Sequence, residues 1–270
     1  MRSLTMRQQT YDLGGKCVYC RKEFAVEDLT DEHIVPRALN GSLILKKGAC
    51  RPCAVKSNKD YEGAALNHDL LIPRRLLELR KSRNRGAKQP PPRPLPPVAI
   101  GDVTMGGDGF DIQLSDDQYP PAFDLVLFPR AGLLDGIDRG STITELRLQL
   151  FNLGGSKNRA TNVTTQHSMI NGPFAKMLAK IGYCYAVAEK GFNAFDGDDI
   201  RALLDGGRDD VYNFVGNVAE PEKLGNHHLH GLYFRERGGW LTVLVHLFAS
   251  CNADPNVPSI PYEVVVGKMK

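Results

Sequence analysis

The sequence has no long apolar run. No stretch of about 18 consecutive apolar residues is present that would span a bilayer as a helix. The first residues, Met1-Arg2-Ser3-Leu4, also lack the apolar core of a secretory signal peptide. We therefore expect a cytoplasmic protein that does not associate with membranes.

Cysteine is scarce, with six residues, but four of them form two pairs of identical spacing, Cys17-x2-Cys20 and Cys50-x2-Cys53. In a reducing compartment such pairs indicate metal or redox chemistry and not disulfides. Two pairs together favour a closed, structural zinc site of four thiolates, with an inert or redox pair as the alternative. The two remaining cysteines, Cys184 and Cys251, are expected to be small buried hydrophobes.

The net charge of +3 conceals an asymmetry. Residues 1–97 carry 19 Lys and Arg against 10 Asp and Glu, whereas the remainder carries 15 against 21. The basic half also holds the cysteine pairs, which points it towards a polyanion such as nucleic acid. A solvated basic face is the alternative explanation for such a bias.

A proline-rich segment, Gln89 to Pro97, can join neither a helix nor a central strand. It predicts two domains, 1–88 and 98–270, separated by a linker at 89–97. The second domain is expected to be α+β. Alternating apolar and polar residues predict half-buried strands at 146–150 and 241–247. An apolar stripe predicts a helix that begins at Pro173. We also expect a shorter helix at 199–204 and a last strand at 262–266.

The stretch between the cysteine pairs predicts a β-hairpin followed by a helix. Ile34 and Val35 suit a short strand that Pro36 ends, Asn40-Gly41 is a turn signal, and residues 43–45 supply the partner strand. A helix that begins just after Cys53, at Ala54, and runs to Leu71 would bring Asn58 and Glu62 onto one face.

Residue chemistry at this hairpin suits phosphodiester hydrolysis. A histidine with a pKa near 6.5 can take a proton from water at neutral pH, which makes His33 a candidate general base. Carboxylate and amide oxygens hold hard divalent ions, which suggests Mg²⁺ or another divalent ion at Glu32 with Asn58 or Glu62. The expected zinc would be a separate, structural ion. His228 and His230, with His227 and His246 near them, are an alternative second metal site. No Cys or carboxylate stands at supporting spacing, so this alternative is not favoured.

Residues 17 to about 70 resemble an HNH endonuclease domain of the ββα-metal type, in the subgroup with a Cys-x2-Cys pair on each side of the acid-His motif. The match is carried by both cysteine pairs, Leu29-Thr-Asp-Glu-His-Ile-Val-Pro36, Asn40-Gly41 and Ser57-Asn58-Lys59. The resemblance implies that His33 is the general base and that Glu32 and Asn58 are metal ligands. The sequence departs from the family where Ala54 replaces an Asn, where the final His is absent, and where the middle Asn has Asn40 as its nearest counterpart.

The leading hypothesis is a metal-dependent endonuclease that cuts DNA, with RNA not excluded and a homodimer possible if both strands are cut. Candidate nucleic-acid contacts are Arg37, Lys56, Arg74, Arg75, Arg80 and Lys81. The alternatives are a non-catalytic zinc-ribbon module that binds nucleic acid, and a protein-interaction role for residues 98–270 attached to an inactive nuclease remnant.

Overall fold

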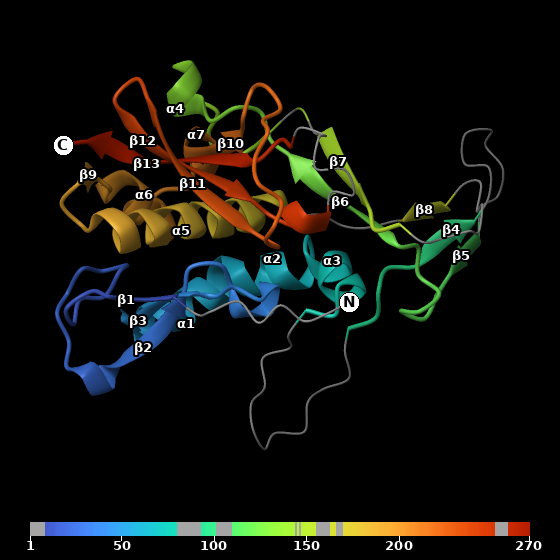
Figure 1. The fold of residues 1–270 in the computed structure, drawn as a ribbon, viewed down its shortest axis with the longest axis horizontal. Helices are drawn as coiled ribbons and strands as arrows, with labels where there is room; N and C mark the ends of the chain where they lie inside the picture. Colours follow the sequence, from blue (N-terminus) through green and yellow to red (C-terminus); the bar gives the residue numbers. More distant parts are fainter. Residues whose placement is uncertain are drawn as a thin grey trace.

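The computed structural model describes residues 9–79, 93–100, 110–143, 145, 147–154, 163–165, 170–251 and 259–270. Helices and strands are mixed along the chain, so the predicted α+β class is confirmed. Figure 1 shows the N-terminal elements beneath a long central helix, with a sheet of C-terminal strands above it.

The N-terminal module is a three-stranded sheet followed by a broken helix. Its strands are β1 (Gln9–Asp12), β2 (Leu29–His33) and β3 (Leu43–Cys50), and β3 lies in the centre, antiparallel to β2 and parallel to β1. The hairpin prediction is confirmed, but its first strand ends at His33 and does not include Ile34 and Val35. Two single 3₁₀ turns flank β2, η1 (Val26–Asp28) and η2 (Arg37–Leu39).

The turn between β2 and β3 depends on Asn40 and Gly41. Asn40 takes a left-handed conformation, with φ of 61°, which Asn tolerates better than most residues. A Cβ atom on Gly41 would lie 1.8 Å from the Val35 carbonyl oxygen, so no larger residue fits there without backbone movement. The turn signal read from the sequence therefore reflects a close approach of two backbones.

The helix after the second cysteine pair is continuous but irregular. It consists of α1 (Arg51–Ser57), a π-helical turn η3 (Asn58–Glu62) and α2 (Gly63–Asn67), and α3 (Leu71–Leu76) follows after a short turn. The Gly63 N–H donates to the Asn58 carbonyl five residues earlier, which is the π pattern. Asn58 is exposed and Glu62 is half-buried, so the two predicted ligands differ in burial.

The C-terminal region is built on a five-stranded antiparallel sheet. Its order is β10 (Val215–Asn217), β13 (Tyr262–Met269), β12 (Trp240–His246) and β11 (Gly231–Arg237), and β9 (Phe195–Asp196) also pairs with β13. Helix α5 (Asn171–Lys190) packs on this sheet, with α6 (Asp198–Leu204), α7 (Val211–Phe214) and α4 (Gly132–Asp135) around it and a 3₁₀ turn, η5 (Ala249–Cys251), after β12. The long helix, the short helix and the last two strands predicted from the sequence are thus confirmed.

Two small sheets complete the described chain. Strand β6 (Ala122–Leu127) pairs with β7 (Arg147–Asn152), and β4 (Val98–Ile100) lies between β5 (Phe110–Ile112) and β8 (Val163–Thr165) at the far end of the molecule (Figure 1). The strand expected near 146–150 exists from residue 147 on, and Leu146 lies outside the described residues. The expected burial of the other two leucines is wrong. Leu148 and Leu150 are 53% and 71% exposed, whereas Phe151 faces the core and stacks on Phe123.

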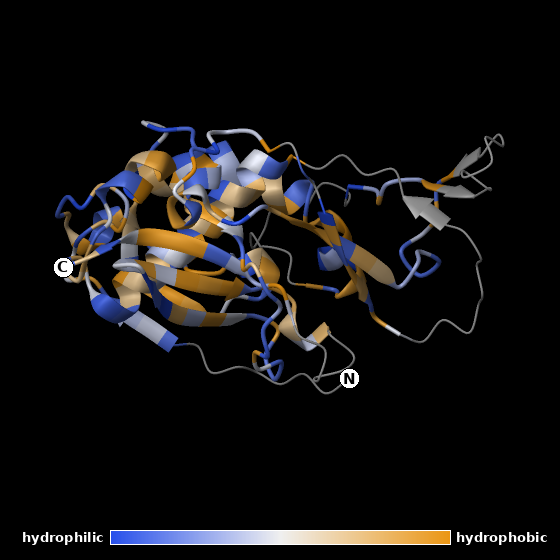
Figure 2. Cartoon of the chain, turned by 90° about the horizontal axis from the view of Figure 1, so that it is seen from above, coloured by the Kyte–Doolittle hydropathy of each residue, from blue (hydrophilic) through white to orange (hydrophobic). Residues whose placement is uncertain are grey.

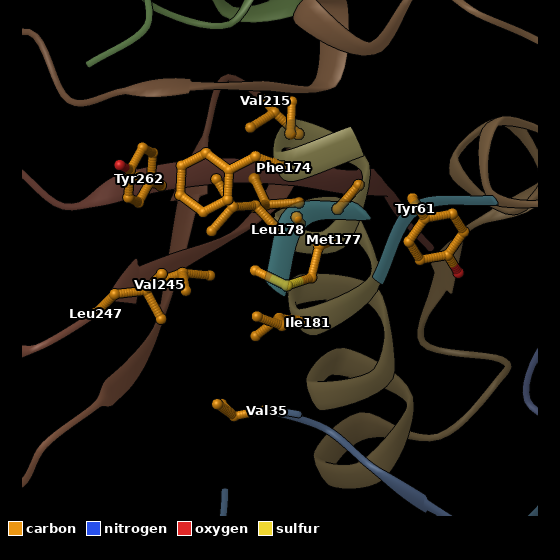
Figure 3. Packing of buried hydrophobic residues seen from close by; sticks show 14 of the residues in the cluster. Val35, Tyr61, Phe174, Met177, Leu178, Ile181, Val215, Val245, Leu247 and Tyr262 are labelled. Atoms are coloured by element: carbon orange, nitrogen blue, oxygen red, sulfur yellow. The ribbon is translucent and has the colours of Figure 1, made fainter. Parts of the chain in front are cut away.

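Helix α5 joins the two regions through one continuous hydrophobic core. In Figure 3, α5 carries Phe174, Met177, Leu178 and Ile181, with residues of the C-terminal sheet on one side and Val35 and Tyr61 of the N-terminal module on the others. Figure 2 shows apolar residues concentrated along the strands of the large sheet. One hydrophobic cluster contains buried residues of both the N-terminal module and the C-terminal region. The division at 89–97 stays a prediction, since 93–97 has no regular secondary structure and 89–92 lies outside the described residues.

Among the described residues, the structure has no helix with the length and apolar character needed to cross a membrane.

Candidate functional site

The four paired cysteines meet at one point in the N-terminal module. Cys17 and Cys20 lie in the turn after β1, Cys50 ends β3, and Cys53 lies in the first turn of α1. Their sulfur atoms all lie within 4.8 Å of one another, and all four are free thiols. Among the described residues, no other group of three or more Cys, His, Asp or Glu side chains converges closely enough to hold a metal ion. The donor set fits a tetrahedral zinc ion.

The pKa values of the cysteines in this cluster are shifted in different directions. A hydrogen bond from Cys53 lowers the pKa of Cys17 to about 4, with smaller help from backbone N–H groups. The same hydrogen bond raises the pKa of Cys53, and burial raises that of Cys20. A thiolate is the form that binds a metal ion, so the lowered pKa of Cys17, caused mainly by Cys53, favours the ligand state of Cys17.

Strand β2 places two candidate residues on opposite sides because side chains alternate along a strand. Glu32 points inward and is 8% exposed, while His33, at the last position of the strand, is half-buried. The neighbouring Asp31 is taken up elsewhere, since it accepts hydrogen bonds from the Lys46 ammonium at 2.8 Å and the Lys47 N–H at 3.0 Å. Glu32 is therefore the carboxylate of this strand that faces the module's interior.

The zinc-compatible cysteines, the hairpin with Glu32 and His33, and the following helix occupy one continuous segment. Residues 17–70 match the HNH endonuclease family. No curated protein and no solved structure matches the chain. The HNH module is thus shown for about a fifth of the chain, and the C-terminal region has no counterpart among the comparisons.

A lysine from the C-terminal region enters the HNH module. Lys180 lies in the middle of α5, its side chain is 0% exposed, and its ammonium nitrogen lies 2.6 Å from Glu32 Oε1 and 2.7 Å from Glu62 Oε1. The same nitrogen donates to the backbone carbonyl of His33, and Ile34 O lies 3.4 Å away. Four oxygen atoms of the HNH module therefore surround one ammonium group.

Burial and neighbouring charges shift the pKa of Lys180, and that of Glu32, in opposite directions. Burial lowers the pKa of Lys180, but Glu32 and Glu62 raise it more, so that it lies well above its ordinary value and the ammonium is charged. Burial raises the pKa of Glu32, and Lys180 counteracts this shift. Burial also lowers the pKa of His33, with a further contribution from Lys180 and Arg37. The imidazole is consequently neutral at neutral pH, as a proton acceptor must be.

The predicted divalent ion does not fit between Glu32 and Glu62 while Lys180 is in place. Both carboxylates direct an oxygen at the ammonium at contact distance, which leaves no volume for a second cation. Asn58, the third predicted ligand, is exposed on the π-helical turn. The oxygen chemistry itself suits a hard divalent ion, so it is the position of Lys180 that prevents the fit.

The predicted nucleic-acid contacts divide into two groups. Arg37 is exposed, and its charge helps to lower the pKa of His33. Lys56 is exposed but pairs with Asp60 at 3.2 Å. Arg74 and Arg75 turn into the protein instead, where Arg74 donates to the Leu66 carbonyl and the Arg75 side chain, 17% exposed, pairs with Asp116. The last two predicted contacts, Arg80 and Lys81, lie outside the described residues.

Two C-terminal histidines lie at the large sheet: His246 is buried at the end of β12, and the half-buried His230 reaches the N-terminal module. His230 Nδ1 accepts the Phe248 N–H at 3.3 Å, which leaves Nε2 to donate to the Leu39 carbonyl at 2.8 Å. Burial lowers the pKa of His230 and of His246 to about 4. His230 thus holds the β2–β3 turn against the large sheet.

Sequence reasoning missed Lys180. It lies within the apolar stripe of α5, three residues after Met177 and four before Cys184, both of which are buried. A lysine on the buried face of a helix is rare unless it is paired. This signal was present in the sequence, although it did not reveal which carboxylates form the pair.

Proposed function

We propose that this chain is an endonuclease that hydrolyses phosphodiester bonds of DNA through its HNH module. The observation that carries the proposal is the placement of His33, which is half-exposed at the end of β2 within the family-matched segment. Its lowered pKa keeps the imidazole free to accept a proton.

In the proposed reaction, the neutral imidazole of His33 takes a proton from a water molecule. The resulting hydroxide attacks the phosphorus, the bond from phosphorus to the leaving oxygen breaks, and that oxygen takes a proton from water while His33 returns its proton to the solvent. The exposed guanidinium of Arg37 is suited to bind the phosphate next to His33. Zinc held by Cys17, Cys20, Cys50 and Cys53 would fasten the hairpin to α1 and would not touch the substrate.

The family resemblance also assigns a divalent ion, such as Mg²⁺, to Glu32 with Asn58 or Glu62. When bound, such an ion neutralises charge on the phosphate. Because Lys180 holds the Glu32–Glu62 pair, no step of the reaction is assigned to that ion here.

The test is cleavage of supercoiled plasmid by zinc-loaded protein with added Mg²⁺ or Mn²⁺, in the wild-type chain and in Lys180→Met. Nicking or linearisation is expected in at least one of these backgrounds and should fall at least about 100-fold with His33→Ala in the same background. His227→Ala, which removes an exposed histidine elsewhere, should keep the activity.

Plasmid that stays intact in both backgrounds, or a His33→Ala protein that cuts as well as its parent, would overturn the proposal. The enclosed carboxylates favour one second candidate, a non-catalytic zinc module that binds nucleic acid. In that case DNA affinity would fall steeply with salt and no ion would induce cleavage.

A further inference from the structure

The Lys180 cluster has the composition of a metal site, but an ammonium group occupies it. Two carboxylate oxygens and two backbone carbonyl oxygens of the HNH module face Lys180 Nζ. Six to eight such oxygens, often completed by water, are the coordination that hard divalent cations prefer. The two carboxylates approach one atom within 2.7 Å, so they need a cation between them to offset their mutual repulsion.

We infer that Lys180 of α5 holds the cation position of the HNH module, so that the C-terminal region keeps the Glu32–Glu62 pair closed to divalent ions. Removal of the ammonium turns the pair into a divalent-ion site. The inference concerns the regulation of the proposed nuclease and rests on that function.

Lys180 stays in place because α5 is fixed on its other sides. The face of α5 towards the large sheet is packed so closely that a Cβ atom on Gly182 would lie 2.7 Å from Val264 Cγ1. On the side of the HNH module, the Tyr183 hydroxyl donates to the Val18 carbonyl at 3.0 Å. The lysine is therefore part of a rigid helix and not a surface side chain that can swing away.

Two consequences follow for the proposed nuclease. An ion can reach Glu32 and Glu62 only if α5 moves or if Lys180 is replaced. Cleavage that uses this ion is therefore latent in the wild-type chain, and the C-terminal region controls it through one side chain.

The experiment measures Mn²⁺ binding to the zinc-loaded full chain by electron paramagnetic resonance and calorimetry. Lys180→Met keeps most of the apolar stem and removes the charge. This variant is expected to bind one Mn²⁺ per chain at least about tenfold more tightly than wild type, and Glu32→Gln in the same background should abolish the gain. Lys176→Ala, which removes a half-buried lysine one turn earlier in α5, should bind Mn²⁺ as the wild type does.

A folded Lys180→Met protein without added Mn²⁺ affinity would overturn the inference, as would a wild-type chain whose Mn²⁺ binding is lost in Glu32→Gln. If Lys180→Met does not fold, the comparison of wild type with Glu32→Gln decides alone, with equal binding supporting the closed pair. Gained Mn²⁺ binding without any plasmid cleavage would support the closed pair while overturning the proposed nuclease, so the two failures are distinguishable.

Discussion

At the scale of single residues, the charge state of a side chain depends on its burial and on the few groups that contact it. His33 and Glu32 are neighbours in sequence, yet one is half-exposed and the other almost fully enclosed. Asp69 is a further example, since it is 3% exposed and its Oδ1 accepts the Ile170 N–H at 3.1 Å, just before the first turn of α5. Oδ2 has no hydrogen-bond partner among the described residues.

The carboxylate of Asp69 is predicted to lower stability at neutral pH. Burial raises its pKa to about 6, above the value of 3.8 expected in the unfolded chain. The folded state binds the proton more tightly, so stability falls as the pH rises from about 4 to about 6 and stays lower above that. Asp69→Asn should therefore stabilise the protein, by about 1 kcal/mol more at pH 8 than at pH 5.

Thermal or urea unfolding of Asp69→Asn and wild type at both pH values measures this difference. Asp205→Asn, at an exposed carboxylate, would show how much of any change comes from net charge alone. A gain that is equal at pH 5 and pH 8 would contradict the assignment of the raised pKa.

At the scale of elements, the sequence predicts the type of an element better than its orientation. The alternation at 146–150 correctly indicated a strand, but Leu148 and Leu150 face outward because Phe123 of the neighbouring strand and the core lie on the other side. The helix after Cys53 was expected to be regular, and the π-helical turn at 58–62 was not foreseen, since no local residue pattern marks it. Helix α5 was foreseen from its apolar stripe, which is a local property.

Helix α5 supplies a direct test of close packing. Gly182→Ala should destabilise the protein, because the new Cβ would lie 2.7 Å from Val264 Cγ1 and 2.8 Å from Val264 Cβ. Overpacking of this kind costs about 1 to 3 kcal/mol and outweighs the gain of roughly 1 kcal/mol in helix propensity. The measurement is the midpoint of thermal unfolding, expected to fall by several degrees.

Gly172→Ala in the first turn of the same helix is the matched control, since nothing lies within 4 Å of its Cβ position. It should leave the midpoint unchanged or raise it slightly. If both variants behave alike, α5 does not approach β13 as closely as described.

At the scale of the whole molecule, the HNH module and the C-terminal region depend on each other. Lys180 and Tyr183 of α5 bond to the HNH module, Asp69 of that module accepts the N–H before α5, and one hydrophobic cluster contains residues of both. We therefore expect the two regions to unfold together.

Removal of zinc should consequently destabilise the entire chain. Chelation, or Cys50→Ser, is expected to lower the midpoint of a single calorimetric transition and to increase hydrogen exchange in β12 and β13 as well as in β2 and β3. Cys251→Ser, at a half-buried cysteine outside the cluster, should have a much smaller effect. A C-terminal transition that is unaffected by chelation would show that the regions unfold independently.

The sequence by itself determined the cysteine cluster, the hairpin with Glu32 and His33, the helix after Cys53 and the long apolar helix α5. These features follow from spacing, turn residues and periodicity, which act over a few residues. Tertiary structure alone decided that Lys180 meets Glu32 and Glu62, that Asp69 accepts the N–H before α5, and that Arg74 and Arg75 turn inward. A buried charge is stable only beside its partner. The partners of Lys180 and Asp69 lie more than a hundred residues away in the chain and are brought together by packing, which no local pattern records.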